Sequence, residues 1–317
     1  MAQISAAWAS APRKFVDPRR TATGERRAQV RLKTLETLWF NTGTLCNLTC
    51  EHCYIESSPR NDRLSYLSAA EVTPFLDEIA LNRLGTGLIG FTGGEPFMNP
   101  ELPAMLEQTL SRGLRALVLT NAMKPMHKCK AALLGLSTRY GGRLTIRVSL
   151  DHYGRAVHEA ERGRRSWQPS LEGLRWLAQN GFCYSVASRR LSGESESALR
   201  AGFARLFSKL GLALDADDPA ALTIFPEMDE NAEVPEITEA CWGILGRSPD
   251  SVMCATSRMV VKRKGARRPS VLACTLLPYD PRFELGASLA EAVGPVPLNH
   301  PHCAKFCVLG GGACSRG

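Results

Sequence analysis

Three cysteines stand close together in the stretch TGTLCNLTCEHCYIESSP, at Cys46, Cys50 and Cys53. The spacing C-x3-C-x2-C puts three thiols on one short segment, and clustered thiolates bind soft metals. A structural zinc site closes with four protein ligands, usually in two pairs, and no further cysteine lies nearby. A 4Fe-4S cluster takes four thiolates, so a cluster held by three cysteines leaves one iron open to a substrate or cofactor.

A second group of cysteines occupies the last part of the chain, and three more are scattered singly among the eleven. A disulfide framework is not expected in a cytosolic protein, so metal binding or catalysis is favoured. Cys241 lies just ahead of the group, and His300 or His302 could replace one thiolate. The group itself consists of Cys254, Cys274, Cys303, Cys307 and Cys314.

The elements that position these residues alternate between short apolar runs and amphipathic segments. We expect strands at 34–40, 88–93, 116–120, 144–150, 182–188 and 221–225. Ser68 with Glu71 forms a capping box that opens a helix towards Gly85, and Asn99 is expected to cap the next helix. Further helices are predicted near 125–138, 170–180 and 196–210. Six β/α units with right-handed crossovers predict an α/β fold, a partial (β/α)6 barrel.

Functional loops in such a fold follow the carboxyl ends of the strands. The three-cysteine loop, TGGEP, LTN and SLD all stand at such ends. In TGGEP the glycines would let the backbone approach a ligand closely, and the carboxylate of the glutamate could accept hydrogen bonds from a cationic group of that ligand. The stretch GTGLIG at 85–90 fits a dinucleotide fingerprint, but it precedes its strand, so we interpret it as a helix end and strand entry.

The three cysteines followed by Tyr54 resemble the signature of the radical S-adenosylmethionine (radical SAM) superfamily. GGEP at 93–96, LTNA at 119–122, and SLDHYG at 149–154 with His158 and ERG match its later motifs in order. The resemblance implies that Cys46, Cys50 and Cys53 hold a catalytic 4Fe-4S cluster, that Ser149 faces the SAM ribose and that Arg162 faces the SAM carboxylate. The implied SAM-binding residues are His52, Tyr54, Gly93, Gly94, Glu95, Pro96, Thr120, Asn121, Ser149, Asp151 and Arg162.

Three positions depart from the family pattern. Ala122 and His152 each replace a glycine, and Glu159 replaces an aspartate.

Three features resemble the SPASM and twitch extensions of these enzymes: the C-terminal cysteines, the hairpin expected around KRKGARR at 262–268, and the stretch FELGASLAEAV at 283–293. The resemblance implies one auxiliary 4Fe-4S cluster, bound by ligands drawn from Cys254, Cys274, Cys303, Cys307 and Cys314. A four-cysteine zinc site is the alternative. We expect an N-terminal arm at 1–33, the barrel at 34–249 and the auxiliary domain at 250–317.

The resemblance implies reductive cleavage of SAM to a 5'-deoxyadenosyl radical, which abstracts hydrogen from a substrate. A flavodoxin- or ferredoxin-type donor is the implied source of the electron. The substrate is a small molecule or a peptide, and the short arm argues modestly against a peptide carrying a leader. The alternative is a non-enzymatic electron carrier, which would close its clusters with four cysteines and need no SAM pocket.

The formal charge of +8 is concentrated in residues 1–33, which hold eight Lys/Arg against two Asp/Glu. We expect this arm to be flexible and solvated, with an Arg-rich transit peptide as the alternative, so a nucleic-acid partner is not favoured. KRKGARR at 262–268 is expected to be a solvated hairpin tip rather than a phosphate site. No apolar run is long enough to span a membrane and no secretory signal is present, which predicts the cytoplasm.

Overall fold

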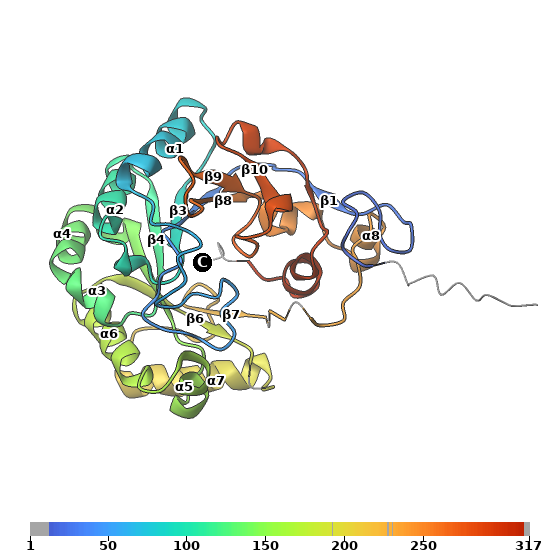
Figure 1. Ribbon diagram of the computed structural model, residues 1–317. Coiled ribbons are helices and arrows are strands. Elements are labelled where there is room, and N and C mark those ends of the chain that lie inside the picture. Colours follow the sequence, from blue (N-terminus) through green and yellow to red (C-terminus); the bar gives the residue numbers. More distant parts are fainter. Residues whose placement is uncertain (1–12, 192, 227, 230, 314–317) are drawn as a thin grey trace, which may run out of the picture.

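The core of the structure is a curved sheet whose parallel strands follow one another in sequence order. The computed structural model describes residues 13–313, apart from residues 192, 227 and 230. Figure 1 shows the curve of the sheet, with helices along its outer face. These strands are β2 (Thr37–Asn41), β3 (Leu88–Thr92), β4 (Arg115–Thr120), β5 (Leu144–Ser149), β6 (Cys183–Arg189) and β7 (Leu222–Phe225). The predicted partial barrel of six β/α units is confirmed.

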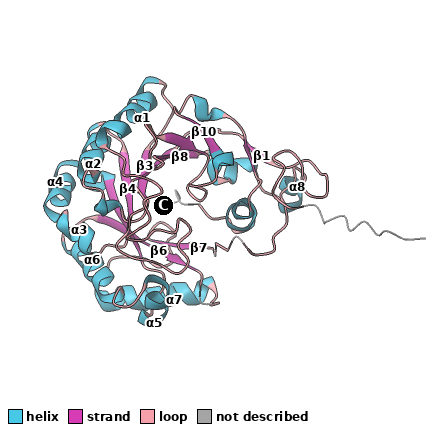
Figure 2. Cartoon of the chain, viewed as in Figure 1, coloured by secondary structure: helices cyan, strands magenta, loops and turns pink. Residues whose placement is uncertain are grey.

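Helices cover the convex side of this sheet, and loops gather on its concave side (Figure 2). Apolar side chains of the helices and strands form one large buried cluster between them. This layering leaves the carboxyl ends of the strands free to carry functional loops. The helices are α1 (Ala69–Leu81), α2 (Leu102–Ser111), α3 (Lys124–Lys128), α4 (Lys130–Tyr140), α5 (Arg155–Arg162), α6 (Trp167–Gln179) and α7 (Glu196–Leu210).

The sequence predicted N-cap residues for two helices, α1 and α2. The capping box at Ser68 and Glu71 is present at the start of α1, with both reciprocal hydrogen bonds. The predicted cap of α2 at Asn99 is wrong, because the helix begins at Leu102 with Glu101 at its N-cap. Asn99 instead ends a short 3-10 helix over Pro96–Met98, and its amide donates to two loop carbonyls.

Two other helices differ from expectation. The helix expected near 125–138 is divided into α3 and α4 at Cys129. Helix α5 was not predicted, because its buried residues are His158 and Glu161 rather than apolar side chains. Val157 is the only large apolar residue of this segment, so no apolar face marked it as a helix in the sequence.

The C-terminal segment extends the same sheet. Strand β8 (Ser257–Val261) pairs in parallel with β2, and β9 (Ser270–Leu272) and β10 (Glu284–Gly286) follow in antiparallel order. The hairpin predicted around 262–268 is therefore confirmed. Its tip is less free than expected, because Lys262 pairs with Glu71 at 2.6 Å. The boundary at residue 250 does not divide the sheet, and the auxiliary domain stays a prediction.

The prediction of a flexible arm is wrong for residues 13–33. Strand β1 (Gln29–Val30) pairs with β11 (Val296–Pro297), and Arg27 is fully buried in an ion pair with Glu236. Val30 of β1 and Val296 of β11 belong to a second cluster of buried apolar residues. The remaining helices near it are α8 (Cys241–Leu245) and a π-helix over Cys303–Leu309. No helix in the described part of the chain is long and apolar enough to cross a membrane.

Candidate functional site

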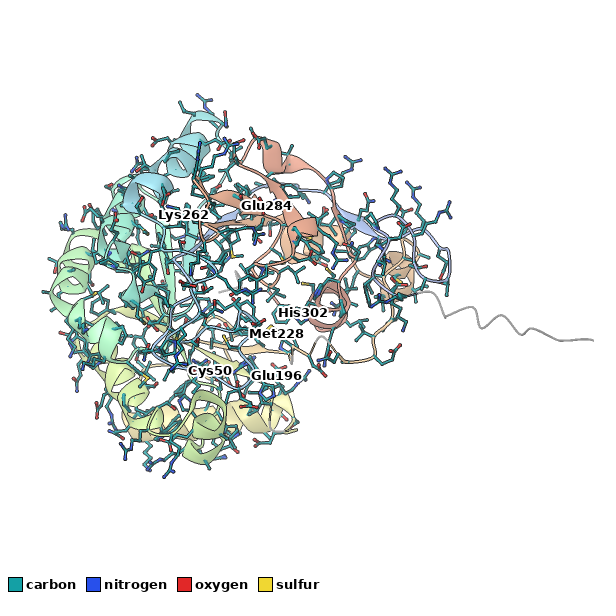
Figure 3. The ribbon with its side chains drawn as sticks, viewed as in Figure 1. Cys50, Glu196, Met228, Lys262, Glu284 and His302 are labelled. Carbon is teal, nitrogen blue, oxygen red and sulfur yellow. The ribbon has the colours of Figure 1, made fainter. Side chains whose placement is uncertain are left out.

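A cavity opens at the carboxyl ends of β2 to β7, on the side of the sheet where ligands bind in such folds. Loops after different strands contribute to one wall, as the barrel topology predicts. Figure 3 shows Cys50 and Met228 on the inner side of the curved sheet. The predicted residues that line the cavity are Cys46, Cys50, His52, Cys53, Tyr54, Gly93, Gly94, Thr120, Asn121, Ser149, Asp151 and Arg162.

The three cysteine sulfurs each have a partner that favours a negatively charged sulfur. Leu48 donates its backbone N–H to the Cys46 sulfur at 3.4 Å, and Ser57 donates to the Cys53 sulfur at 3.3 Å. The pKa of the Cys50 thiol is raised by burial but lowered by the Arg162 guanidinium. Burial raises the pKa of Cys46 to about 12. A metal must therefore displace the thiol protons when it binds.

No group of three His, Cys, Asp or Glu side chains within residues 13–313, as far as these are described, is arranged to hold a metal ion. The ligands of a four-iron cluster bind different irons, so they need not converge on a single point as zinc ligands do. The three cysteines share one cavity wall, and two of their sulfurs accept backbone N–H groups. This donor set fits an iron-sulfur cluster better than a single ion.

The two glycines after β3 let this loop pack against the cysteine loop. Gly93 has a φ of +140°, and a Cβ on Gly94 would lie 2.2 Å from the Leu45 carbonyl oxygen. Gly94 also donates its N–H to the Gly43 carbonyl at 2.8 Å. The glycines are thus required for the docking of the two loops, besides any contact with a ligand.

Glu95 and Pro96 do not line the cavity, although the sequence predicted both as cofactor-binding residues. The buried Glu95 carboxylate accepts hydrogen bonds from the Thr120 hydroxyl at 2.7 Å and the Asn121 N–H at 2.9 Å. Burial raises the pKa of Glu95 to about 7 despite these donors. Glu95 therefore holds the loop after β4 in place.

The loop after β4 reaches the cysteine loop through Asn121, whose amide donates to the Asn47 side chain at 2.9 Å. Ala122 follows with a φ of +58°, a conformation that favours glycine. Ala122 stands where the family motif has a glycine, so its side chain is held in a backbone conformation that costs strain.

Asp151, after β5, is the centre of a buried charge network. Its carboxylate pairs with Arg162 at 2.6 Å and with Arg189 at 3.0 Å. The two guanidinium groups hold its pKa well below the ordinary range against the effect of burial. Asp151 thus fixes both cations at the cavity wall.

The network continues to the cysteine loop through Glu161, which pairs with Arg189. The His52 ring lies 2.7 Å from the Glu161 carboxylate, and Arg189 donates to the His52 carbonyl at 2.7 Å. Sequence reasoning missed Arg189 and Glu161. Arg189 ends β6, so a charged residue at the carboxyl end of a barrel strand was the available signal.

The departure at His152 also has a structural reason. The His152 Nδ1 atom accepts the Gly154 N–H at 2.9 Å, and Nε2 lies 2.7 Å from the Glu194 carboxylate. The Tyr153 hydroxyl donates to the same carboxylate at 2.7 Å. His152 therefore closes a turn that a glycine would leave open.

The wall that faces the C-terminal segment is apolar. It is formed by Phe225, Met228 and Phe306, and the rings of the two phenylalanines lie 5.9 Å apart. Phe306 belongs to the π-helix and stands between Cys303 and Cys307. One helix thus contributes both to the cavity and to the C-terminal cysteine group.

Three of the predicted auxiliary ligands lie near one another. The thiols of Cys254 and Cys274 act electrostatically on Cys303, and burial holds the pKa of Cys303 well above its ordinary value. Cys307 stands on the same π-helix as Cys303, whereas Cys314 lies outside the described residues. Cys241 contacts Thr238 instead, with the sulfur 3.4 Å from the hydroxyl. The rings of His300 and His302 lie 4.8 Å apart, and burial lowers the pKa of His300 to about 4.

A model of the Radical SAM superfamily matches residues 40–191. The antilisterial bacteriocin subtilosin biosynthesis protein AlbA of Bacillus subtilis is 32% identical over 143 residues, covering 45% of this chain and 30% of AlbA. GTP 3',8-cyclase of Rhodococcus opacus is 34% identical over 141 residues, covering 43% of this chain and 38% of the cyclase. Mycofactocin maturase MftC of Mycobacterium tuberculosis is 27% identical over 169 residues, covering 53% of this chain and 41% of the maturase.

Solved structures agree on the fold. Streptococcus suis SuiB bound to S-adenosylmethionine superposes with a TM-score of 0.59 at 12% identity, covering 80% of this chain and 64% of SuiB. AnSMEcpe with bound AdoMet gives a TM-score of 0.58 at 14% identity, covering 81% of this chain and 79% of that protein. The chain spans less than half the length of the curated relatives described above. The segment that matches the Radical SAM superfamily model holds the three cysteines, the glycine loop and the Asp151 network.

Proposed function

We propose that this protein cleaves SAM reductively at a 4Fe-4S cluster and uses the resulting radical to abstract hydrogen from a substrate. The observation that carries the proposal is that the three cysteines share one cavity with the residues matched to SAM binding, Ser149 and Arg162 among them. A closed electron carrier would not need this cavity. The alternative of a non-enzymatic carrier is therefore disfavoured.

When bound, the cluster supplies the electron that splits SAM into methionine and a 5'-deoxyadenosyl radical. The work of the protein is to bind, orient and exclude water. Cys46, Cys50 and Cys53 hold the cluster, and the backbone at Gly93 and Gly94 receives the SAM amino group. Arg162 pairs with the SAM carboxylate, since Asp151 holds its guanidinium at the cavity wall.

The remaining predicted contacts take supporting roles in this proposal. Ser149 faces the ribose, while His52, Tyr54, Thr120 and Asn121 complete the walls around the cofactor. Glu95 acts indirectly, because its carboxylate holds the Thr120–Asn121 loop. A flavodoxin- or ferredoxin-type protein donates the electron.

The apolar wall is the place for the substrate. Phe225, Met228 and Phe306 offer no hydrogen-bonding side chains, so they suit an apolar C–H group. AlbA is named for the biosynthesis of a bacteriocin, MftC is named a maturase, and SuiB has been crystallised with the precursor peptide SuiA. We therefore propose an apolar peptide side chain as the substrate group, although the cyclase and heme-synthase relatives keep a small molecule as the alternative.

We further propose one auxiliary 4Fe-4S cluster on Cys254, Cys274, Cys303, Cys307 and Cys314. The electrostatic effect of Cys254 and Cys274 on Cys303 supports a shared site. Cys303 and Cys307 share the π-helix with Phe306, which lines the cavity, so a cluster on these cysteines would suit electron exchange with a substrate radical there. The zinc alternative has the same ligands and is decided by metal analysis.

The test is anaerobic reconstitution followed by iron, sulfide and zinc analysis. The protein should bind about eight irons as two clusters and form 5'-deoxyadenosine with dithionite and SAM. Replacement of Cys46, Cys50 and Cys53 by alanine should leave about four irons and abolish 5'-deoxyadenosine. A zinc-only protein, or full SAM cleavage by the triple variant, contradicts the proposal.

The substrate proposal needs cells rather than purified protein. Peptide and small-molecule fractions from gene-deleted and wild-type cells should differ by a modified peptide. A difference confined to small molecules would favour the alternative. A variant with Cys303, Cys307 and Cys314 changed to alanine should keep 5'-deoxyadenosine formation but lose the product. If a folded variant of this kind still makes product, the auxiliary site is structural.

A further inference from the structure

Arg258, on β8, is a fully buried arginine next to the C-terminal cysteines, with 1% of its surface exposed. Its Nε atom donates to the Ala292 carbonyl at 2.8 Å, and Nη1 donates to the Cys254 carbonyl at 2.6 Å. Its Nη2 atom is buried and has no hydrogen-bond partner in the described chain. Carbonyl groups thus satisfy part of the guanidinium and leave its charge uncompensated.

The contrast with Arg27 makes this arrangement unusual. Both arginines are among the largest fully buried side chains, yet Arg27 pairs with the Glu236 carboxylate. Among the described residues, the titratable groups that act on Arg258 are the cysteines Cys254 and Cys274, and no Asp or Glu does so. A buried cation without an anion is strongly unfavourable, so an anion is expected at this place.

The neighbouring sulfurs are the only groups of the described chain on hand to supply that anion. As thiols they are neutral, and Cys254 lies directly beside the guanidinium, because its backbone carbonyl accepts from Arg258 Nη1. A metal displaces the thiol protons, and a metal-thiolate group then carries net negative charge. A metal-thiolate group on these cysteines would therefore also supply the anion that the Arg258 guanidinium lacks.

We infer that Arg258 is a positioning residue that balances the charge of the auxiliary iron-sulfur cluster and raises its reduction potential. The inference rests on the auxiliary cluster of the proposed function. One-electron reduction by dithionite adds a negative charge to the cluster, which a nearby cation stabilises. The reduced form should therefore gain more than the oxidised form from Arg258.

The experiment uses the full chain with Cys46, Cys50 and Cys53 changed to alanine, so that the C-terminal cluster is observed alone. Arg258→Gln keeps N–H donors but removes the charge, and Arg258→Lys keeps the charge. A potentiometric titration followed by electron paramagnetic resonance measures each potential. Arg258→Gln should lower the equilibrium constant for reduction about tenfold, which is about 59 mV for one electron. Arg258→Lys should shift it by much less.

Arg147→Gln is the matched control, because Arg147 is also buried, with 3% exposed, but lines a separate cavity at the other end of the strands. Its variant should leave the potential unchanged. Equal potentials for Arg258→Gln and Arg258→Lys, with iron retained, would overturn the inference alone. If the background variant binds zinc or no iron, the auxiliary cluster itself is refuted and the inference fails with it. Loss of iron in Arg258→Gln but not in Arg258→Lys or Arg147→Gln would support it.

Discussion

Replacing Asp151 by asparagine tests whether the buried charge network holds the cavity wall together. Asp151 exposes 2% of its side chain, and its two partners Arg162 and Arg189 expose 13% and 12%. Asparagine keeps the shape but removes the charge. The network would then hold two guanidinium groups against the single carboxylate of Glu161.

The expected loss follows from the burial of the network. Removing one partner of a buried ion pair costs about 3 to 5 kcal/mol, and the slight exposure of the arginines favours the lower value of about 3 kcal/mol. With an unfolding entropy of about 2.1 cal/mol/K per residue over 317 residues, this corresponds to a Tm lowered by about 4 to 5 °C. The pKa of Asp151 lies below its ordinary value, so this stabilisation is present above about pH 4 and is lost only at lower pH.

The assay compares Asp151→Asn with Asp77→Asn by thermal unfolding from pH 5 to 8. Asp77 also pairs with an arginine, Arg112, at 2.8 Å, but the two side chains expose 50% and 31%. An exposed pair contributes less than about 1 kcal/mol, so this control should lower Tm by about 1 °C or less. Equal shifts in the two variants would refute the conclusion that the Asp151 network is a buried, stabilising unit.

Three further predictions concern the loops around the cavity. Arg162→Ala should weaken SAM binding about ten- to a hundredfold in calorimetry while iron content is retained, since a charge-assisted contact contributes about 1.5 to 3 kcal/mol; unchanged binding would mean that the motif match is wrong. Glu95 has a folded pKa of about 7, so stability should fall by about 3 kcal/mol between about pH 4.5 and 7, and Glu95→Gln should remove that slope in denaturant titrations. Gly94→Ala should displace the cysteine loop and reduce iron per chain, because the new Cβ would lie 2.2 Å from the Leu45 oxygen, whereas Gly135→Ala, which meets nothing within 4 Å, should bind iron normally.

The sequence predicted the barrel well because its signals are local. Alternating apolar runs located the parallel strands, and the Ser68–Glu71 pair located the start of α1. The expected site loops also lie together, since the carboxyl ends of parallel strands meet at one edge. Motif order was therefore sufficient to assemble most of the cavity.

The failures share a physical cause, which is dependence on partners far away in the sequence. Arg27 is buried in an ion pair with Glu236, which lies far away in the sequence, so local composition suggested a solvated arm. Arg189 gains its role from Asp151 and Glu161, which stand on other segments. Glu95 was expected in the cavity, but its carboxylate turns to Thr120. Side-chain direction within a known motif is not encoded in its spacing.

The pairing of β2 with β8 has a consequence for how the protein folds. Residues Thr37 and Ser257 are register partners, so the first barrel strand finds its neighbour on one side more than two hundred positions later. Such long-range pairing slows folding, since a long loop must close before the contact forms. During synthesis the β2 edge stays open until the chain beyond β8 has left the ribosome. The cysteine loop that follows β2 is therefore fully packed only late in folding. A cluster can be inserted during the period in which this loop is still accessible.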